Sequence, residues 1–235
     1  MAMRVREFAK TVDHTLLKPD TTEKEIVLIC EEAAEYHFAA VCIPPGYVRR
    51  AARELSGVDV KVATVISFPF GADTMAIKTS AVRDAIVGGA SELDVVMSIS
   101  RFLSGDFNYV AEELASLNQE VSVVAMNNGL NDIVVKVIIE TAYLDDKMKR
   151  LATQIVAASG ADFVKTSTGF APSGATPEDV AILREEAPEG LAVKASGGIR
   201  TLDDALEMLN AGASRLGMSS SVAVMKEAED GGLQE

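Results

Sequence analysis

Two lysine residues lie in stretches whose composition predicts buried β-strands. Lys165 follows apolar residues and precedes small hydroxyl residues in the segment Phe-Val-Lys-Thr-Ser-Thr-Gly at 163–169. Lys194 has a similar setting in Leu-Ala-Val-Lys-Ala-Ser at 191–196. A buried ammonium group must be paired or lose its proton, and a neutral amine can attack a carbonyl compound to form a Schiff base. The alternative is a structural lysine that pairs with a carboxylate or reaches out to water.

The two lysines are separated by one predicted strand–helix unit, so their strands should be neighbours. Lys165 and Lys194 would then face each other at matching strand ends. Like-charge repulsion would lower the pKa of each amine, which activates a lysine near neutral pH.

A third strand supplies carboxylates. In the segment Ser-Glu-Leu-Asp-Val-Val-Met at 91–97, alternation places Glu92 and Asp94 on one face. Asp94 could pair with the lysines and move protons, and a purely structural ion pair is an equally good interpretation. We interpret Lys136, in the strand expected at 134–140, as an electrostatic partner of Asp94 or Glu92.

Two glycine-containing segments are candidates for phosphate binding. Gly197 and Gly198 follow the strand of Lys194, and Gly-Met-Ser-Ser-Ser at 217–221 follows the last predicted strand and opens a final helix. In α/β barrels these two loops often bind phosphate through backbone N–H groups and a helix N-terminus. A Gly-Gly pair alone usually marks only a turn.

The elements that must position these residues alternate between strands and helices. Strands are expected at 12–16, 39–43, 60–67, 92–97, 134–140, 162–166, 191–195 and 215–218. Such alternation predicts a parallel sheet, and about eight units predict a single (β/α)8 TIM barrel over residues 1–235 with a short N-terminal helix. An open doubly wound sheet is the alternative. Segment 120–126 alternates like a strand, but we favour the end of a long helix that starts near Tyr109.

Several helix boundaries are readable from local sequence. Thr22 and Glu25 form a capping-box pattern, and Asp145 is a candidate N-cap. Thr176 followed by Pro177 marks another helix start. The acidic tail at 227–235 is expected to be frayed.

Composition excludes several classes of function. The chain of 235 residues has a formal net charge of -13, which disfavours binding to nucleic acids and membrane surfaces. Cys30 and Cys42 do not form a disulfide framework, and the N-terminal residues resemble neither a signal peptide nor a membrane span, so we expect a cytoplasmic protein. With only His14 and His37 and no nucleotide-binding motif, we expect neither a metal nor a cofactor.

Six segments resemble the deoxyribose-phosphate aldolase family in order and spacing. They are Asp-His-Thr-Leu-Leu at 13–17, Ala-Val-Cys-Ile at 40–43, Glu-Leu-Asp-Val-Val at 92–96, Lys-Val-Ile-Ile-Glu-Thr at 136–141, the segment at 163–169 and Lys-Ala-Ser-Gly-Gly-Ile-Arg-Thr at 194–201. The resemblance runs from about Asp13 to Ser221. It implies a single barrel and a class I aldolase without metal, which reversibly cleaves 2-deoxy-D-ribose 5-phosphate to D-glyceraldehyde 3-phosphate and acetaldehyde.

The resemblance also implies roles for individual residues. Lys165 matches the Schiff-base lysine, Lys194 the lysine that tunes it, and Asp94 the acid/base aspartate that acts through a water. Substrate and phosphate binding is implied for Gly169, Gly197, Gly198, Ser219 and Ser220, with Thr168 assigned to the same group and Cys42 to the pocket lining. The family further implies a homo-oligomer, either a dimer or a tetramer. Two other functions stay open: a phosphosugar isomerase or epimerase, and a non-catalytic phosphosugar-binding barrel.

Overall fold

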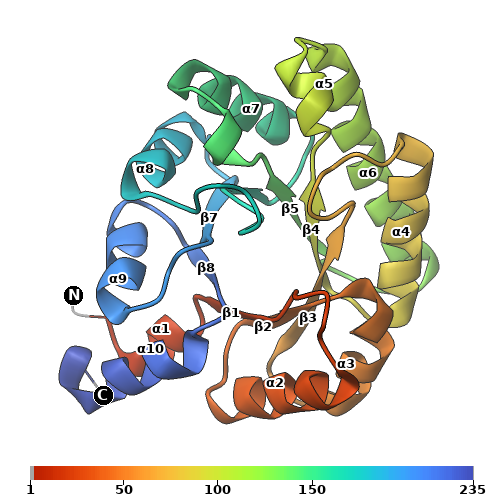
Figure 1. The fold of residues 1–235 in the computed structure, drawn as a ribbon. Helices are drawn as coiled ribbons and strands as arrows, with labels where there is room; N and C mark the ends of the chain where they lie inside the picture. The colour runs from red at the N-terminus through yellow and green to blue at the C-terminus, as the bar shows by residue number, and fades with distance from the viewer. Residues whose placement is uncertain (1–2, 235) are drawn as a thin grey trace.

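Eight parallel strands close into a barrel in the computed structural model, which describes residues 3–234. Each strand pairs with its neighbour in sequence, and β8 returns to pair with β1, with Asp13 opposite Gly217. Figure 1 shows the strands at the centre and the helices around them. This closure confirms the (β/α)8 barrel and excludes the open sheet. The strands are β1 Val12–Thr15, β2 Ala40–Ile43, β3 Lys61–Ile66, β4 Glu92–Val96, β5 Val134–Ile138, β6 Phe163–Lys165, β7 Ala192–Ser196 and β8 Arg215–Met218.

The helices follow the strands in regular alternation. α1 precedes the barrel as the expected short N-terminal helix, and the 3₁₀ turns η1 and η2 lie in the loops after β2 and β5. The helices and turns are α1 Val5–Ala9, α2 Glu23–Glu35, η1 Pro45–Tyr47, α3 Val48–Glu54, α4 Met75–Gly88, α5 Ile99–Leu103, α6 Phe107–Asn127, η2 Thr141–Tyr143, α7 Asp146–Ala158, α8 Pro177–Glu186, α9 Leu202–Asn210 and α10 Ser221–Glu227. Segment 120–126 is the end of the long helix α6, as expected.

Side-chain caps fix the starts of the helices that the sequence predicted. Thr22 and Glu25 bond reciprocally at the start of α2, which confirms the capping box. The side chains of Asp145 and Thr176 accept hydrogen bonds from backbone N–H groups in the first turns of α7 and α8. Each cap satisfies a donor that the helix leaves unpaired, so the residue at which each helix begins is set locally.

The C-terminal tail differs from the frayed segment that its sequence suggested. Ala228–Gly232 form a turn of π-helix, and Ala228 is fully buried. Gln234 forms a bridge with Arg4, and the N–H of Val5 donates to the carbonyl of Gln234. Thus the two ends of the chain are joined at residues 4–5 and 234, while Glu235 lies outside the described residues.

A buried ion pair joins α4 and α6 next to β4. Lys78 of α4 lies 2.9 Å from Glu113 of α6, and both side chains are fully buried. Glu113 also accepts hydrogen bonds from the N–H and the hydroxyl of Ser98, which lies in the loop after β4. The ion pair between α4 and α6 therefore holds this loop in place through Ser98. Within residues 3–234, no helix has the length and apolar character needed to cross a membrane.

Candidate active site

Lys165 stands at the C-terminal end of β6 with its side chain only 3% exposed. Its Nζ lies 2.7 Å from Oδ2 of Asp94. Burial lowers the pKa of Lys165, and this effect outweighs the opposing attraction of Asp94, while the positive charge of Lys194 lowers the pKa further. A part of the lysine population is thereby made available as the neutral amine at lower pH than for a lysine in water.

Lys194 on β7 is paired in register with Lys165. Its Nζ lies 2.7 Å from the same oxygen of Asp94, and it also donates to Asp13. Burial lowers the pKa of Lys194, but Asp13 and Asp94 outweigh burial and raise the pKa overall. The expectation that each lysine lowers the other's pKa is therefore correct in direction for Lys165 and wrong for Lys194, which stays an ammonium.

Asp94 on β4 is the common partner of three lysines. Its Oδ1 accepts a hydrogen bond from Lys136 at 2.8 Å, and its Oδ2 accepts from Lys165 and Lys194 at 2.7 Å each. Burial alone would raise the pKa of Asp94, but the three cations hold it well below its usual range. Asp94 is thus a carboxylate at neutral pH. Lys136 lies 2.7 Å from Glu92, which confirms the pairing expected for this lysine.

Two charged residues complete the arrangement without having been singled out by sequence. Asp13 on β1 pairs with Lys194 and, at 2.7 Å, with Nη1 of Arg215 on β8. Arg215 also lies 3.1 Å from Glu92. We call the seven connected side chains the charged cluster: Asp13, Glu92, Asp94, Lys136, Lys165, Lys194 and Arg215.

The charged cluster is balanced when Lys165 is neutral. It contains three carboxylates and four cationic side chains. The pKa values of Lys136, Lys194 and Arg215 are all raised, so these three cations keep their charges and match the three carboxylates. Among the four cationic side chains of the cluster, Lys165 is the one whose pKa is lowered. The surroundings therefore favour a neutral amine at the position from which a carbonyl group can be reached.

A cavity of 380 Å³ opens above Lys165 at the C-terminal ends of the strands. Lys165 lines it, together with the predicted substrate-binding residues Thr168, Gly169, Gly197, Gly198 and Ser219. Lys18 and Arg200 also line this cavity, which we call the catalytic cavity, and place two cationic side chains beside the glycine loops. Sequence reasoning missed both, although cations near a predicted phosphate loop are a readable signal. Glycine loops with cations at this end of a barrel suit a phosphate group.

Two predicted pocket residues do not line the catalytic cavity. Ser220 is the N-cap residue of α10, one position beyond Ser219. Cys42 is fully buried in a small apolar group with Ala40, Ala63 and Val65. Burial, followed by the charge of Asp94, raises the pKa of the Cys42 thiol to about 11, so it stays a neutral thiol. Cys42 thus acts as a small side chain in the barrel interior rather than as a surface of the cavity.

Glu140 holds the loop that follows Lys165. Its backbone has a φ of 56°, in the left-handed region, and its side chain is buried. The carboxylate accepts one hydrogen bond from the hydroxyl of Thr168 and another, at 3.2 Å, from the backbone N–H of the same residue. Burial raises the pKa of Glu140, against the two hydrogen bonds from Thr168, which lower it. Strained backbone of this kind persists where the surrounding structure fixes it and often occurs at functional sites.

Comparison with known proteins assigns a family to this arrangement. A profile of the DeoC/LacD family of aldolases matches residues 8–226. The chain belongs to this aldolase family. It is 49% identical over 225 residues to the deoxyribose-phosphate aldolase of Caldanaerobacter subterraneus subsp. tengcongensis, covering 96% of this chain and 95% of the relative. It is 48% identical to that of Clostridium kluyveri, covering 96% of this chain and 100% of the relative.

Solved structures agree with the assignment. The aldolase QR15 superimposes with a TM-score of 0.87 at 38% identity, covering 95% of this chain and 96% of the other. The tetrameric deoxyribose-phosphate aldolase of Aeropyrum pernix gives 0.86 at 34% identity, covering 96% and 92%. The cluster and the catalytic cavity of this aldolase therefore lie on a framework shared with solved members of the same group.

Proposed function

We propose that the protein reversibly cleaves 2-deoxy-D-ribose 5-phosphate to D-glyceraldehyde 3-phosphate and acetaldehyde through a Schiff base on Lys165. The observation that carries this proposal is the lysine of lowered pKa that lines the catalytic cavity beside a fixed carboxylate. The names of the relatives at 48–49% identity support the choice of substrate. An isomerase or a binding protein would not need a balanced cluster that leaves one amine neutral.

Each step of the proposed reaction has a group on this chain to perform it. The amine of Lys165 attacks the aldehyde carbon, and the carbinolamine loses water to give a protonated imine. The imine withdraws the electron pair of the bond between the second and third carbons, while the hydroxyl on the third carbon loses its proton. We assign this proton to Asp94 through a water, because Asp94 is the ionised carboxylate beside Lys165. Protonation of the enamine and hydrolysis release acetaldehyde and the free lysine.

The remaining residues bind the phosphate and position the groups that react. The ammonium of Lys194 keeps Asp94 oriented and lowers the pKa of Lys165. Gly169, Gly197, Gly198 and Ser219 hold the phosphate, with Lys18 and Arg200 as charge partners. Anchoring the phosphate in the cavity that Lys165 also lines fixes the aldehyde carbon near the amine, which turns the attack into an intramolecular step. Ser220 contributes through its place at the start of α10.

We also propose a homo-oligomer, a dimer or a tetramer, located in the cytoplasm. The tetrameric Aeropyrum pernix structure supports the first part. Two free buried thiols, Cys30 and Cys42, support a reducing compartment.

The decisive experiment is borohydride trapping with acetaldehyde followed by peptide mapping. A reduced adduct on Lys165 is expected. Lys165→Ala should abolish both the adduct and turnover with the fold intact, whereas Lys149→Ala, on α7 outside the cavity, should keep both. An adduct on Lys194 instead would reverse the roles of the two lysines, and a folded protein without a specific adduct would favour the isomerase or the binding protein.

A further inference from the structure

Glu92 and Arg215 lie at the far end of the charged cluster and take no part in the proposed reaction steps. Each is the first residue of its strand, β4 or β8, whereas Lys165 is the last residue of β6. Parallel strands begin at one face of a barrel and end at the other, so these two residues lie toward the face opposite the catalytic cavity. The guanidinium of Arg215 lies over the ring of Phe163, two positions before Lys165 on β6.

Two routes of ion pairs connect Arg215 with Lys165. In the first route, Arg215 pairs with Glu92 at 3.1 Å, and Glu92 pairs with Lys136 at 2.7 Å. Lys136 then pairs with Asp94 at 2.8 Å, and Asp94 pairs with Lys165 at 2.7 Å. The second route runs through the two other members of the cluster, the carboxylate on β1 and the lysine on β7. The carboxylate beside Lys165 is therefore shared with cations that the far end of the barrel holds in turn.

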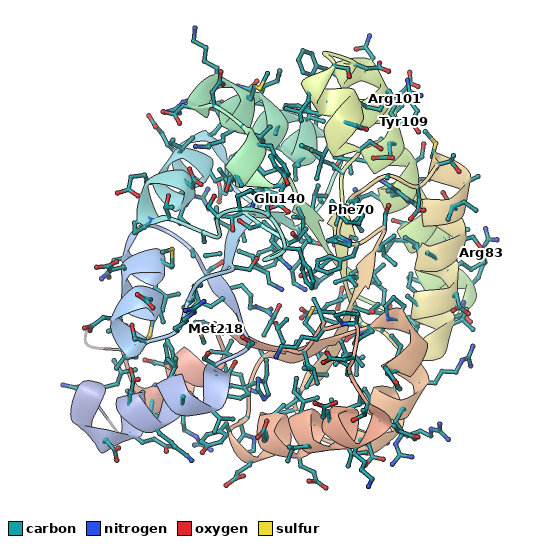
Figure 2. The ribbon with its side chains drawn as sticks, viewed as in Figure 1. Phe70, Arg83, Arg101, Tyr109, Glu140 and Met218 are labelled. Atoms are coloured by element: carbon teal, nitrogen blue, oxygen red, sulfur yellow. The ribbon has the colours of Figure 1, made fainter. Side chains whose placement is uncertain are left out.

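Most of the charged cluster has no contact with water. The side chains of Glu92 and Arg215 are only 4% and 15% exposed, and the members between them and Lys165 are fully buried. Figure 2 shows side chains filling the interior of the barrel between Glu140, which follows β5, and Met218 at the end of β8. In a protein interior with an effective dielectric constant of about 20, a unit charge roughly 10 Å away changes the pKa of an amine by about one unit. A change of charge at the far end should therefore alter the titration of Lys165.

The charged and titratable groups nearest to Lys165 come from other strands and loops than β6. They are Asp94 on β4, Lys194 on β7, the thiol of Cys42 on β2 and the carboxylate of Glu140 after β5. Lys18 and Arg200 line the same cavity as Lys165. Within the part of the chain that the structure describes, Glu92 and Arg215 form no ion pair with any of these groups. A substitution at Glu92 or Arg215 thus leaves the groups that face Lys165 in place.

The charge balance of the cluster gives the two far residues opposite effects. With Lys165 neutral, three carboxylates match three cations. Without the charge of Glu92, two carboxylates remain beside three cations, so a proton on Lys165 is disfavoured more strongly. Without the charge of Arg215, three carboxylates remain beside two cations, so a proton on Lys165 restores the balance. We propose that Glu92 and Arg215 are positioning residues that set the protonation state of Lys165 from the opposite end of the barrel, through the ion pairs of the charged cluster.

This inference rests on the proposed Schiff base, but the protonation of Lys165 can be measured without any substrate. The protein is labelled with a trace of acetic anhydride at a series of pH values, and the peptide that carries Lys165 is quantified. Acetic anhydride reacts with a neutral amine and not with an ammonium, so the labelling reports the titration of Lys165. The midpoint should fall by about one pH unit in Glu92→Gln and rise by about one pH unit in Arg215→Gln. In the double variant the two effects should cancel to within about half a pH unit.

Both single variants are expected to fold. Each substitution leaves every other member of the charged cluster with at least one partner of opposite charge. Circular dichroism checks the fold, and either folded single variant is sufficient for the test. The matched controls are Glu112→Gln, exposed on α6, and Arg49→Gln, whose side chain on α3 is 65% exposed. They remove the same charges from the surface and should leave the titration of Lys165 as in wild type.

Two outcomes would overturn the inference. One is a Lys165 that titrates in a folded Glu92→Gln or Arg215→Gln variant as it does in wild type. The other is a shift in the same direction in both variants, which would indicate a general disturbance of the barrel and not an effect of charge. A wild-type protein that forms no acetaldehyde adduct on Lys165 would instead refute the proposed function, whatever the titration of the amine, so the two failures are distinguishable.

Discussion

At the scale of single residues, two lysines that share one carboxylate have pKa values shifted in opposite directions. Lys165 and Lys194 lie at the same distance, 2.7 Å, from Oδ2 of Asp94. Both are buried, but Lys194 has a second carboxylate, Asp13, and Lys165 does not. Burial therefore prevails at Lys165 and its pKa falls, while the two carboxylates prevail at Lys194 and its pKa rises. Lys194 thus differs from Lys165 by one additional ion pair.

Glu140 allows a test of whether the loop after Lys165 must be held in position by hydrogen bonds. Glu140→Leu removes both acceptors of Thr168, so a buried N–H loses its partner at a cost of about 1–3 kcal/mol. We expect the loop after Lys165 to shift and kcat/KM for the phosphorylated substrate to fall about tenfold or more. Glu140→Gln keeps an acceptor of the same shape and should stay within about threefold of wild type, without a change in the pH profile. Melting temperatures serve as a control for folding, and wild-type kcat/KM in Glu140→Leu would contradict the role.

Local sequence identified three charged residues of the site and missed Asp13, whose partners are distant in sequence. Lys165, Lys194 and Asp94 were found because a charge inside an apolar strand must be explained. Asp13 breaks the same rule on β1, yet its partners Lys194 and Arg215 are 181 and 202 positions away in sequence. No local pattern reports that β8 returns to β1. For the same reason the sequence did not reveal the raised pKa of Lys194.

At the scale of elements, the loop from β6 to α8 is packed directly onto the loop after β7. The N–H of Ala175 donates to the carbonyls of Ser196 and Gly197. A Cβ at Gly174 would overlap the carbonyl oxygen of Gly197. Glycine is required here for close approach rather than for an unusual φ. The contact couples the loop after Lys165 to the loop that carries Gly197 and Gly198.

Gly174→Ala should separate phosphate binding from imine formation. The new methyl group must push the two loops apart, so we expect KM for 2-deoxy-D-ribose 5-phosphate to rise on the order of ten- to a hundredfold. Trapping with acetaldehyde has no phosphate to misplace and should stay within about twofold of wild type. Gly46→Ala is the matched control, because no atom of the described residues lies within 4 Å of the place that its new methyl group would take. An unchanged KM in Gly174→Ala would show that the two loops are not coupled.

Element boundaries were less predictable than element types. Apolar runs that are mostly β-branched identified six strands, and shorter candidates near the two ends of the chain identified β1 and β8. The caps at Thr22, Asp145 and Thr176 identified helix starts, because these signals are local as well. The strand expected at 162–166 is only Phe163–Lys165, although the backbone groups of Asp162 and Thr166 still form hydrogen bonds with the neighbouring strands. Likewise the tail is ordered through contacts with the N-terminus, which composition does not show.

At the scale of the whole molecule, barrel closure brings the charged cluster together. Its members come from β1, β4, β5, β6, β7 and β8, and β1 meets β8 only in the closed sheet. The same closure excludes water from most of these side chains, with Asp13, Asp94, Lys136 and Lys194 fully buried. Ion pairs of this kind are retained only when each charge has partners, so the cluster makes the whole fold sensitive to pH.

The direction of this sensitivity follows from the pKa shifts. Asp13 and Asp94 have lowered pKa values, so their contribution to stability is complete above the pKa of an unfolded Asp, about 3.9, and is lost as pH falls below it. Lys136 and Lys194 have raised pKa values, so their contribution is complete below the pKa of an unfolded Lys, about 10.4, and is lost as pH rises above it. The contribution of Lys165 to stability has the opposite sign, because a lowered lysine pKa destabilises the folded protein at any pH below about 10.4, the pKa of an unfolded Lys.

We therefore expect the free energy of unfolding in urea to be highest between about pH 5 and pH 9 and to decline on both sides. Asp13→Asn leaves Lys194 and Arg215 short of a carboxylate and should lower the free energy of unfolding at pH 7 by about 3–5 kcal/mol. It should also make the decline toward acid less steep, because one group with a lowered pKa is gone. Asp84→Asn, whose side chain on α4 is 84% exposed, should change the free energy by less than about 0.5 kcal/mol and keep the wild-type slope. An acid decline as steep in Asp13→Asn as in wild type would mean that the charged cluster does not govern acid unfolding, and that the exposed carboxylates do.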